Sequence, residues 1–406
     1  MVMDVKKIRE DFPRLQKGDG LIYFDNASTS LKPRQVIDAV VNYYTDVAGN
    51  TGRGSHRSSQ KATMLVEEAR GDVSKLIGIK PTELAFTRNT TEGINAIAVS
   101  LERMGHFHEG DEIIVSAMEH HANLIPWQEL AKRTGAKLKI APLKEDYTLD
   151  MQALEGMAGK RTKLVSMCHA SNTVATIIPA QEVAKIARDA GALFLLDGAQ
   201  SVPDFEVNPK KIGCDFLVFS GHKMLGPTGV GAMYAKPELM EKMPPYNYGG
   251  GIVKKVTYEK TVYETGPQKF EAGTLAIAQI IGFGEAARYL RRVELGNVHA
   301  HAKKLLSHAL QKLGEIDGIK IYGPQNPEKQ RSIALFECVG MDPVDLAIGL
   351  DESKNIAIRS GLHCAEPIVA SINPKGLDRA SFYLYNTIDE INIFAEEVKS
   401  ITKAFR

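Results

Sequence analysis

The chain has 406 residues, which is enough for a large hydrophobic core and favours two domains. Its 50 lysines and arginines nearly balance 49 aspartates and glutamates, so a broad nucleic-acid-binding surface is not expected. No apolar stretch is long enough to span a membrane, and the charged N-terminus lacks the apolar region of a secretory signal.

The N-terminal two thirds alternate between short apolar runs and helical patterns. Strands are predicted at 83–89, 111–120, 136–143, 162–170, 191–200 and 214–223. Helices are predicted between several of them, including one over 122–135 and one that starts at Pro179 and ends at Gly191. This order predicts an α/β fold with a mostly parallel sheet and helices on both faces.

The pattern changes towards the C-terminus. The segment 246–274 is rich in Gly and Tyr and is expected to be irregular or a hairpin, and a mixture of helices and strands follows it. We therefore expect a large domain over 21–287 and a smaller α+β domain over 288–406, which carries Cys364 and Arg379. An N-terminal segment, 1–20, is expected to pack with the smaller domain.

Reactive side chains follow the predicted strands, and ligands of open parallel sheets bind at the carboxyl ends of the strands. Asp197 ends one strand, where it either caps a turn or pairs with the nitrogen of a bound pyridine ring. Gln200 could donate to an oxygen of such a ring. Lys223 ends the next strand, where it either reaches for water or forms a Schiff base with an aldehyde cofactor and moves protons at the substrate Cα.

Other strand ends suit the rest of such a cofactor. Thr90 and Thr91 open a helix and could hold a phosphate, although a plain threonine cap is an equally common use. His120 could stack on a flat ring, or it and His121 could be a histidine pair without a ligand. Nothing in the spacing of these residues suggests a metal.

Several motifs together resemble one enzyme family along almost the whole chain. They are "YFDNAST", "TTEGIN", "MEHHAN", "DGAQ", "FSGHKMLGPTGVG", "FEAGT", "RSGLHCAEP" and "RASFYLYNT". They resemble the pyridoxal-phosphate-dependent cysteine desulfurases of the class V aminotransferase superfamily, and most closely the Suf-type group, which includes selenocysteine lyase-like enzymes. The resemblance implies a fold-type I homodimer that acts on L-cysteine, uses pyridoxal 5'-phosphate and passes sulfur to an acceptor protein.

Site residues are implied by the same resemblance. The positions that match cofactor-binding residues are Thr90, Thr91, His120, Asn172, Asp197, Gln200, Ser220, His222, Lys223 and, from a second subunit, Thr274. The positions that match the substrate site are Asn172, Arg359, Arg379, Arg53 and His56. Lys223, His120 and Cys364 match the catalytic residues. The chain departs from the usual family pattern at Val174, Ala175 and Leu362.

Cys364 is the residue that suits sulfur transfer. A thiolate can attack the substrate sulfur, which leaves a persulfide on the enzyme and alanine as product. Gly361 and Pro367 mark a loop around it, so an accessible thiol is predicted, whereas the other three cysteines are expected to be buried. The four cysteines form no CxxC pair, which argues against a disulfide framework and favours a reducing cytoplasm.

Three alternatives use the same scaffold. A lyase that prefers selenocysteine would use the same residues, and no motif separates it from a desulfurase. An aminotransferase of this fold would need no cysteine at position 364. A non-catalytic sulfur-assembly subunit is disfavoured because it would have no use for a carboxylate-binding arginine together with an exposed thiol.

Overall fold

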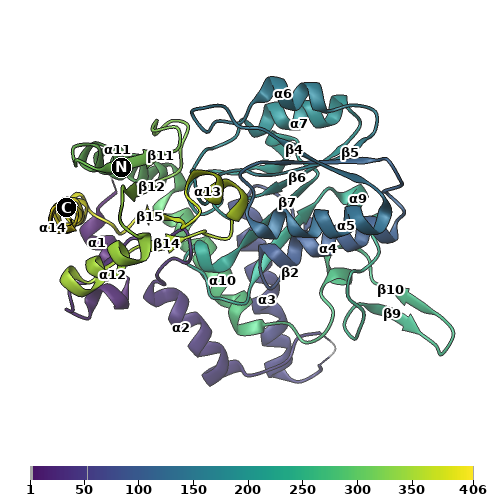
Figure 1. Ribbon diagram of the computed structural model, residues 1–406. Helices are drawn as coiled ribbons and strands as arrows, with labels where there is room; N and C mark the ends of the chain where they lie inside the picture. The colour runs from purple at the N-terminus through teal and green to yellow at the C-terminus, as the bar shows by residue number, and fades with distance from the viewer. Residues whose placement is uncertain (1–2, 53, 406) are drawn as a thin grey trace.

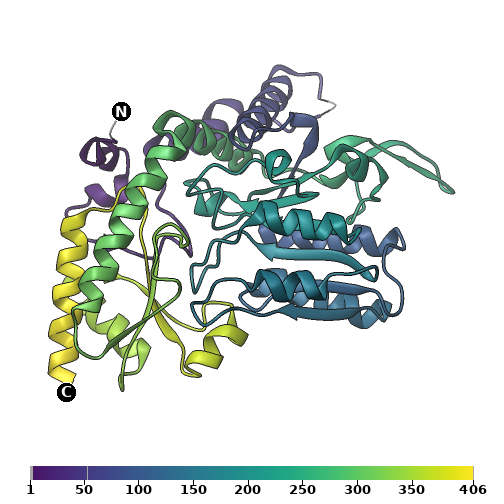
Figure 2. The ribbon, with the colours of Figure 1, turned by 90° about the horizontal axis from the view of Figure 1, so that it is seen from above.

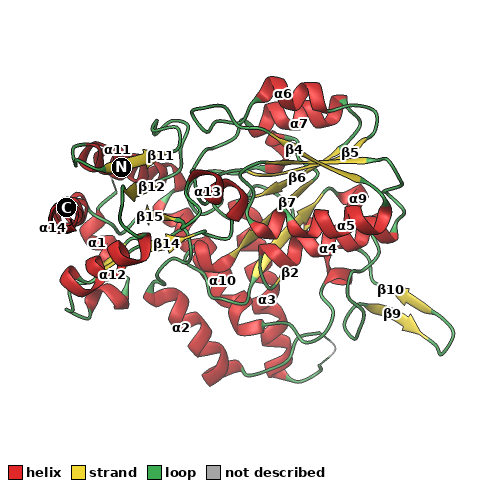
Figure 3. Ribbon diagram, in the orientation of Figure 1, coloured by secondary structure: helices red, strands yellow, loops and turns green. Residues whose placement is uncertain are grey.

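The computed structural model describes residues 3–52 and 54–405 (Figure 1). The two largest sheets among these residues have seven and four strands, and two further pairs of strands lie outside them. Helices pack around both sheets, as Figure 3 shows. Among the described residues, no helix is long and apolar enough to cross a membrane.

The seven-stranded sheet has the order β2-β8-β7-β6-β5-β3-β4. Its strands are β2 (Leu84–Thr87), β3 (Glu112–Ser116), β4 (Lys137–Ala141), β5 (Thr162–Cys168), β6 (Leu193–Asp197), β7 (Phe216–Ser220) and β8 (Gly231–Ala235). All neighbours from β7 to β4 pair in parallel, whereas β8 is antiparallel to both of its neighbours. The six expected strands and the mostly parallel α/β architecture are confirmed. β8 was not expected because its short run contains no β-branched residue.

Helices cover both faces of this sheet (Figure 2). One face carries α4 (Thr90–Arg103), α5 (Ile125–Thr134) and α9 (Pro237–Lys242). The other carries α3 (Arg57–Leu76), α6 (Met151–Met157), α7 (Ala180–Asp189) and α10 (Ile277–Val293). Adjacent residues of β6 point to opposite faces of the sheet. Leu195 packs in the core with α4, α5 and α9, and Leu196 packs in the core with α3, α6, α7 and α10. The helices expected at 122–135 and from Pro179 to Gly191 are confirmed as α5 and α7.

The four-stranded sheet is antiparallel and has the order β11-β12-β15-β14. Its strands are β11 (Ile319–Tyr322), β12 (Ile333–Cys338), β14 (Arg359–Gly361) and β15 (Leu377–Ser381). The nearby helices are α11 (Leu295–Gly314), α12 (Pro343–Lys354), α13 (Glu366–Ile372) and α14 (Ile388–Phe405). Apolar residues of α11, α12 and α14 form one core with this sheet, which fixes the strands that carry Arg379 and lead to Cys364.

The N-terminal region lies against the C-terminal part of the chain. β1 (Ile22–Tyr23) pairs in parallel with β13 (Ile356–Ala357). Arg9, in α1 (Val5–Glu10), forms an ion pair of 2.8 Å with Glu390 of α14. These contacts bring the polar residues after β1 close to β15, where Asp25 bridges to Ser381.

A hairpin of β9 (Val253–Val256) and β10 (Thr261–Tyr263) projects from the body of the molecule (Figure 1). It confirms a hairpin within 246–274, and Tyr258 at its turn is fully exposed. The remaining helical elements are η1 (Pro13–Gln16), α2 (Arg34–Asn42), η2 (Tyr43–Val47), η3 (Pro81–Glu83), η4 (His121–Asn123), α8 (Pro209–Ile212), η5 (Gly221–Lys223) and η6 (Gly266–Phe270).

Candidate active site

A cavity of about 260 Å³ lies where the carboxyl ends of the central parallel strands face the small sheet. The predicted residues that line it are Thr90, Thr91, His120, Asn172, Asp197, Gln200, Ser220, His222, Lys223, Arg359, Cys364 and Arg379. The fold therefore collects on one cavity side chains that come from both sheets and are far apart in the sequence.

Lys223 ends the turn η5, which directly follows β7. Burial lowers the pKa of its amine to about 8, against the opposing effect of the Asp197 carboxylate, and the Arg379 guanidinium lowers it further. Glycine at 221 lets the turn pack closely, because a Cβ there would lie 3.0 Å from the Val230 side chain. A partly neutral amine in a cavity can act as a nucleophile and carry protons near neutral pH.

Asp197 is the last residue of β6, and Gln200 lies on the loop that follows it. Burial raises the pKa of Asp197, while the backbone N–H of Ala199, which donates to Oδ1 at 2.8 Å, lowers it. The Gln200 amide nitrogen donates to the carbonyl of Ala27 at 2.8 Å, and its Oε1 is buried without a partner among the described residues. A buried carboxylate and an unpaired amide oxygen both favour a polar ring as their ligand.

The N-terminus of α4 forms another wall of the cavity. Asn89 caps this helix by accepting the N–H of Glu92 at 2.9 Å, so the cap is an asparagine and not a threonine. The N–H of Thr90 donates to the Ser220 hydroxyl at 2.9 Å, and the two hydroxyls are 2.7 Å apart. Burial lowers the pKa of His222 to about 4, so its ring is neutral at pH 7. Hydroxyls, backbone N–H groups and a helix N-terminus together suit a phosphate.

His120 follows β3 and also lines the cavity. Its Nδ1 accepts the backbone N–H of Ala122 at 3.0 Å, which places the proton of the neutral ring on Nε2. Burial, together with the charge of Lys223, lowers the pKa of His120 to about 3. The ring is therefore neutral at pH 7 and suited to stack on a flat ligand.

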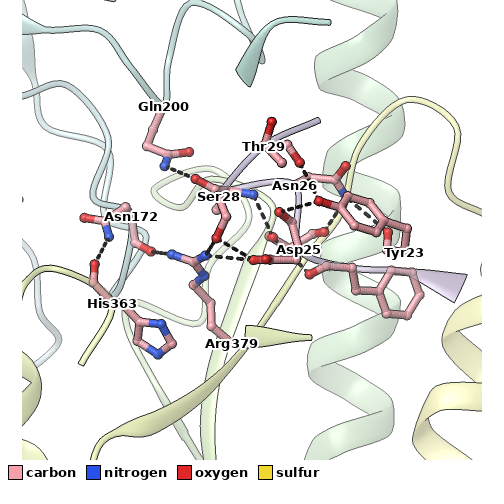
Figure 4. Close-up of polar contacts among 12 residues, drawn as sticks. Tyr23, Asp25, Asn26, Ser28, Thr29, Asn172, Gln200, His363 and Arg379 are labelled. Carbon is pink, nitrogen blue, oxygen red and sulfur yellow. Dashed lines mark hydrogen bonds and ion pairs between the residues drawn. The ribbon is translucent and has the colours of Figure 1, made fainter. Parts of the chain in front are cut away.

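Arg379 lies at the centre of a polar network (Figure 4). Its Nη1 donates to the carbonyl of Asn172 at 2.9 Å, and its Nη2 donates to Asp25 at 3.0 Å and to the Ser28 hydroxyl at 2.7 Å. Burial lowers the pKa of Arg379 to about 10, while the Asp25 carboxylate raises it. The Nε–H is buried and has no partner within the described residues, which leaves a donor for a carboxylate ligand.

Cys364 lies on the loop between β14 and α13, and its thiol is exposed as predicted. The carbonyl of the preceding residue, His363, accepts the side-chain amide of Asn172 at 2.8 Å. The other cysteines are buried as predicted. Cys168 nevertheless contributes to the cavity wall, and burial raises its pKa well above the ordinary value.

Three predicted residues are not placed in this cavity. Thr274 is exposed and lines a separate cavity of about 710 Å³, beside Gly52 and Arg70. His56 is exposed and caps α3 by accepting the N–H of Ser59 at 3.3 Å. Arg53 lies outside the described residues. Within a single chain, Thr274 and His56 therefore do not contribute to the site.

Other functional side chains were not selected from the sequence. Asp25 and Ser28 hold Arg379, and His121 contacts the Cys364 loop. Asp25 and Ser28 belong to a polar run that follows a short apolar segment near residue 22, and this run is the sequence feature that could have indicated them. The strand in that segment pairs with a strand more than 300 residues away.

The chain is similar to known proteins over nearly its whole length. The profile of the family described as aminotransferase class-V matches residues 22–394. The chain belongs to this family. Among class-V relatives, a probable cysteine desulfurase of Synechocystis is 41% identical, covering 98% of this chain and 96% of the relative. A cysteine desulfurase of Haloferax volcanii is 39% identical, covering 99% and 98%.

Solved structures of class-V relatives agree with the fold. The apo structure of a cysteine desulfurase from Thermococcus onnurineus has a TM-score of 0.95 and 38% identity, covering 100% of this chain and 99% of that one. An Escherichia coli cysteine desulfurase with an S-sulfonic acid has a TM-score of 0.92 and 32% identity, covering all of both chains.

The cofactor of the class-V family is pyridoxal 5'-phosphate, and the cavity fits it. The hydroxyls and N–H groups at the start of α4 suit the phosphate, the Asp197 carboxylate suits the ring nitrogen, and the unpaired Oε1 of Gln200 suits the ring hydroxyl. Lys223 offers the amine that an aldehyde requires.

Proposed function

We propose that this chain is a cysteine desulfurase that converts L-cysteine to L-alanine and holds the sulfur as a persulfide on Cys364. The relatives described as cysteine desulfurases support this activity because they match nearly the whole chain. One observation carries the proposal: the exposed thiol of Cys364 lines the same cavity as the amine of Lys223. An enzyme that only transfers amino groups would not need a thiol at this position.

The chain's own residues bind and orient the substrate. Arg379 offers its unpaired Nε–H to the substrate carboxylate, and Asn172, which accepts from Arg379, lies beside it. Lys223 moves a proton at the substrate Cα, since its lowered pKa lets it act as both base and acid. When bound, pyridoxal phosphate withdraws electrons from the substrate Cα. The neutral ring of His120 covers the site without adding a charge.

The sulfur step then follows from the position of Cys364. Its thiolate attacks the substrate sulfur, so an S–S bond forms while the C–S bond breaks. The electron pair of the broken bond stays with the substrate carbon, which takes up a proton and leaves as part of alanine. The outer sulfur of the persulfide passes to a thiol of an acceptor protein, which the exposure of the loop permits.

Finer assignments belong to the same proposal. We place the enzyme in the Suf-type group, supplying sulfur for iron–sulfur clusters or other sulfur-containing products. A homodimer in which Thr274 and His56 approach the partner's cofactor would give these two exposed residues a role. We also propose the division into a large domain over 21–287 and a small domain over 288–406, with the N-terminal segment 1–20 packing with the small domain.

The activity is tested by incubating the purified holoenzyme with L-cysteine and a reductant and measuring alanine and sulfide together. Equal amounts are expected from the wild type, and neither product from Lys223→Ala. Cys364→Ala should lose sulfide formation while it retains the cofactor absorbance. The same assay with L-selenocysteine identifies a selenocysteine lyase if selenide is released much faster than sulfide is from L-cysteine. Transfer of the amino group to an oxo acid, unaffected by Cys364→Ala, would refute desulfuration.

A further inference from the structure

His121 contacts the Cys364 loop, residues 362–366, at two points. Its backbone N–H donates to the carbonyl of Cys364 at 2.7 Å. Its ring Nε2 accepts the backbone N–H of Glu366 at 3.2 Å. The loop after β3, on the large sheet, is thereby joined to the segment that carries the thiol.

The Cys364 loop has a backbone that needs outside support. His363 and Cys364 have φ angles of 53° and 54°, so two consecutive residues with side chains adopt the left-handed conformation. That conformation is unfavourable for residues with a Cβ and persists where surrounding contacts hold it. Within the loop itself, the N–H of Ala365 donates to the carbonyl of Leu362 at 3.0 Å, which closes one tight turn.

Two sets of contacts from other parts of the chain hold this strained turn. In the first set, the carbonyl of His363 accepts from Asn172 at 2.8 Å, and the His363 ring Nε2 donates to the carbonyl of Leu377 at 2.9 Å. The second set comes from His121. The N–H that its ring accepts belongs to Glu366, the first residue of α13, and the first N–H groups of a helix have no partner within the helix.

We infer that His121 is a positioning residue for the reaction: it holds the Cys364 loop so that the thiol faces the substrate sulfur. The inference rests on the proposed function, because it presupposes that Cys364 takes up that sulfur. The ring accepts a hydrogen bond through Nε2, which requires a neutral imidazole with its proton on Nδ1. A side chain that only fills space would not need an acceptor at this point.

The inference is tested on the holoenzyme by hydrogen–deuterium exchange at the amide of Glu366, alongside steady-state desulfuration kinetics. In His121→Ala, exchange at this amide should be faster by about two- to tenfold, the value of one lost hydrogen bond. The kcat should fall while the KM for L-cysteine changes little, since Arg379 and Asn172 keep their contacts. His121→Gln, whose carbonyl oxygen can replace Nε2 as acceptor, should restore part of both quantities. The matched control is His108→Ala, at an exposed histidine of the loop before β3. It should change neither the exchange at Glu366 nor kcat.

Several results would overturn the inference. In His121→Ala, exchange at the Glu366 amide could be unchanged, or it could be faster by the same factor as at amides throughout the large sheet. His121→Gln could also lose as much kcat as His121→Ala does. The exchange measurement does not depend on turnover. If the wild type fails to release sulfide from L-cysteine, the proposed function is wrong. The exchange data would still show whether the His121 ring holds the Glu366 amide.

Discussion

The lowered pKa of Lys223 makes a quantitative prediction about cofactor uptake. A neutral amine attacks an aldehyde, whereas an ammonium group cannot, so the rate at which the apoprotein links pyridoxal phosphate covalently should rise with pH. With a pKa of about 8, roughly a tenth of the Lys223 side chains are neutral at pH 7. A lysine with the ordinary value of 10.5 would be neutral in roughly 0.03% of molecules at that pH, about 300-fold less.

The assay is stopped-flow absorbance after pyridoxal phosphate is mixed with apoprotein over a range of pH. The rate should fall about tenfold per pH unit below the pKa and level off above about 8. Lys223→Ala binds the cofactor without a covalent bond and so reports the titration of the cofactor itself, which is subtracted. A rate that keeps rising to pH 10, or a midpoint near 10.5, would refute the argument that burial depresses this pKa.

Two further predictions concern the supports of the site. Asp25→Asn should lower the free energy of unfolding by about 2 kcal/mol, because it removes the counter-ion of the buried Arg379; urea unfolding measures this. Gly231→Ala should lower it by about 2 kcal/mol and weaken cofactor retention, because the new Cβ would lie 2.8 Å from the Cα of Asn89, the cap of α4. Gly71→Ala, in the middle of α3 with no atom within 4 Å of its new Cβ, should instead stabilise the protein by about 0.5–1 kcal/mol.

Each of these predictions has a contrary outcome. A loss below about 0.5 kcal/mol in Asp25→Asn would mean that water or the neighbouring hydroxyl compensates the guanidinium. If Gly231→Ala and Gly71→Ala behave alike, close backbone packing at β8 does not constrain the cofactor site.

The large sheet and its reactive strand ends could be predicted from the sequence because both depend on local signals. A buried parallel strand leaves a continuous apolar run, which locates Asp197 as the last residue of β6 and Lys223 in the turn directly after β7. The network around Arg379 could not be predicted in this way. Asp25 and Ser28 reach it through β1, a two-residue strand whose pairing with β13 depends on contacts between distant parts of the chain. The task of His121 is equally non-local, since its partners follow it by more than 240 residues.

The position of Asn172 has a consequence for the choice of substrate. Its main-chain oxygen holds Arg379, while its side-chain nitrogen holds the carbonyl of His363, next to the attacking thiol. One residue therefore joins the part of the site that recognises a carboxylate to the part that removes sulfur. An amine such as cysteamine has a thiol but no carboxylate, so it would leave the Arg379 Nε–H without a partner. Weak recognition of such an amine is therefore expected, because the residue that holds the carboxylate-binding guanidinium also holds the loop of the thiol.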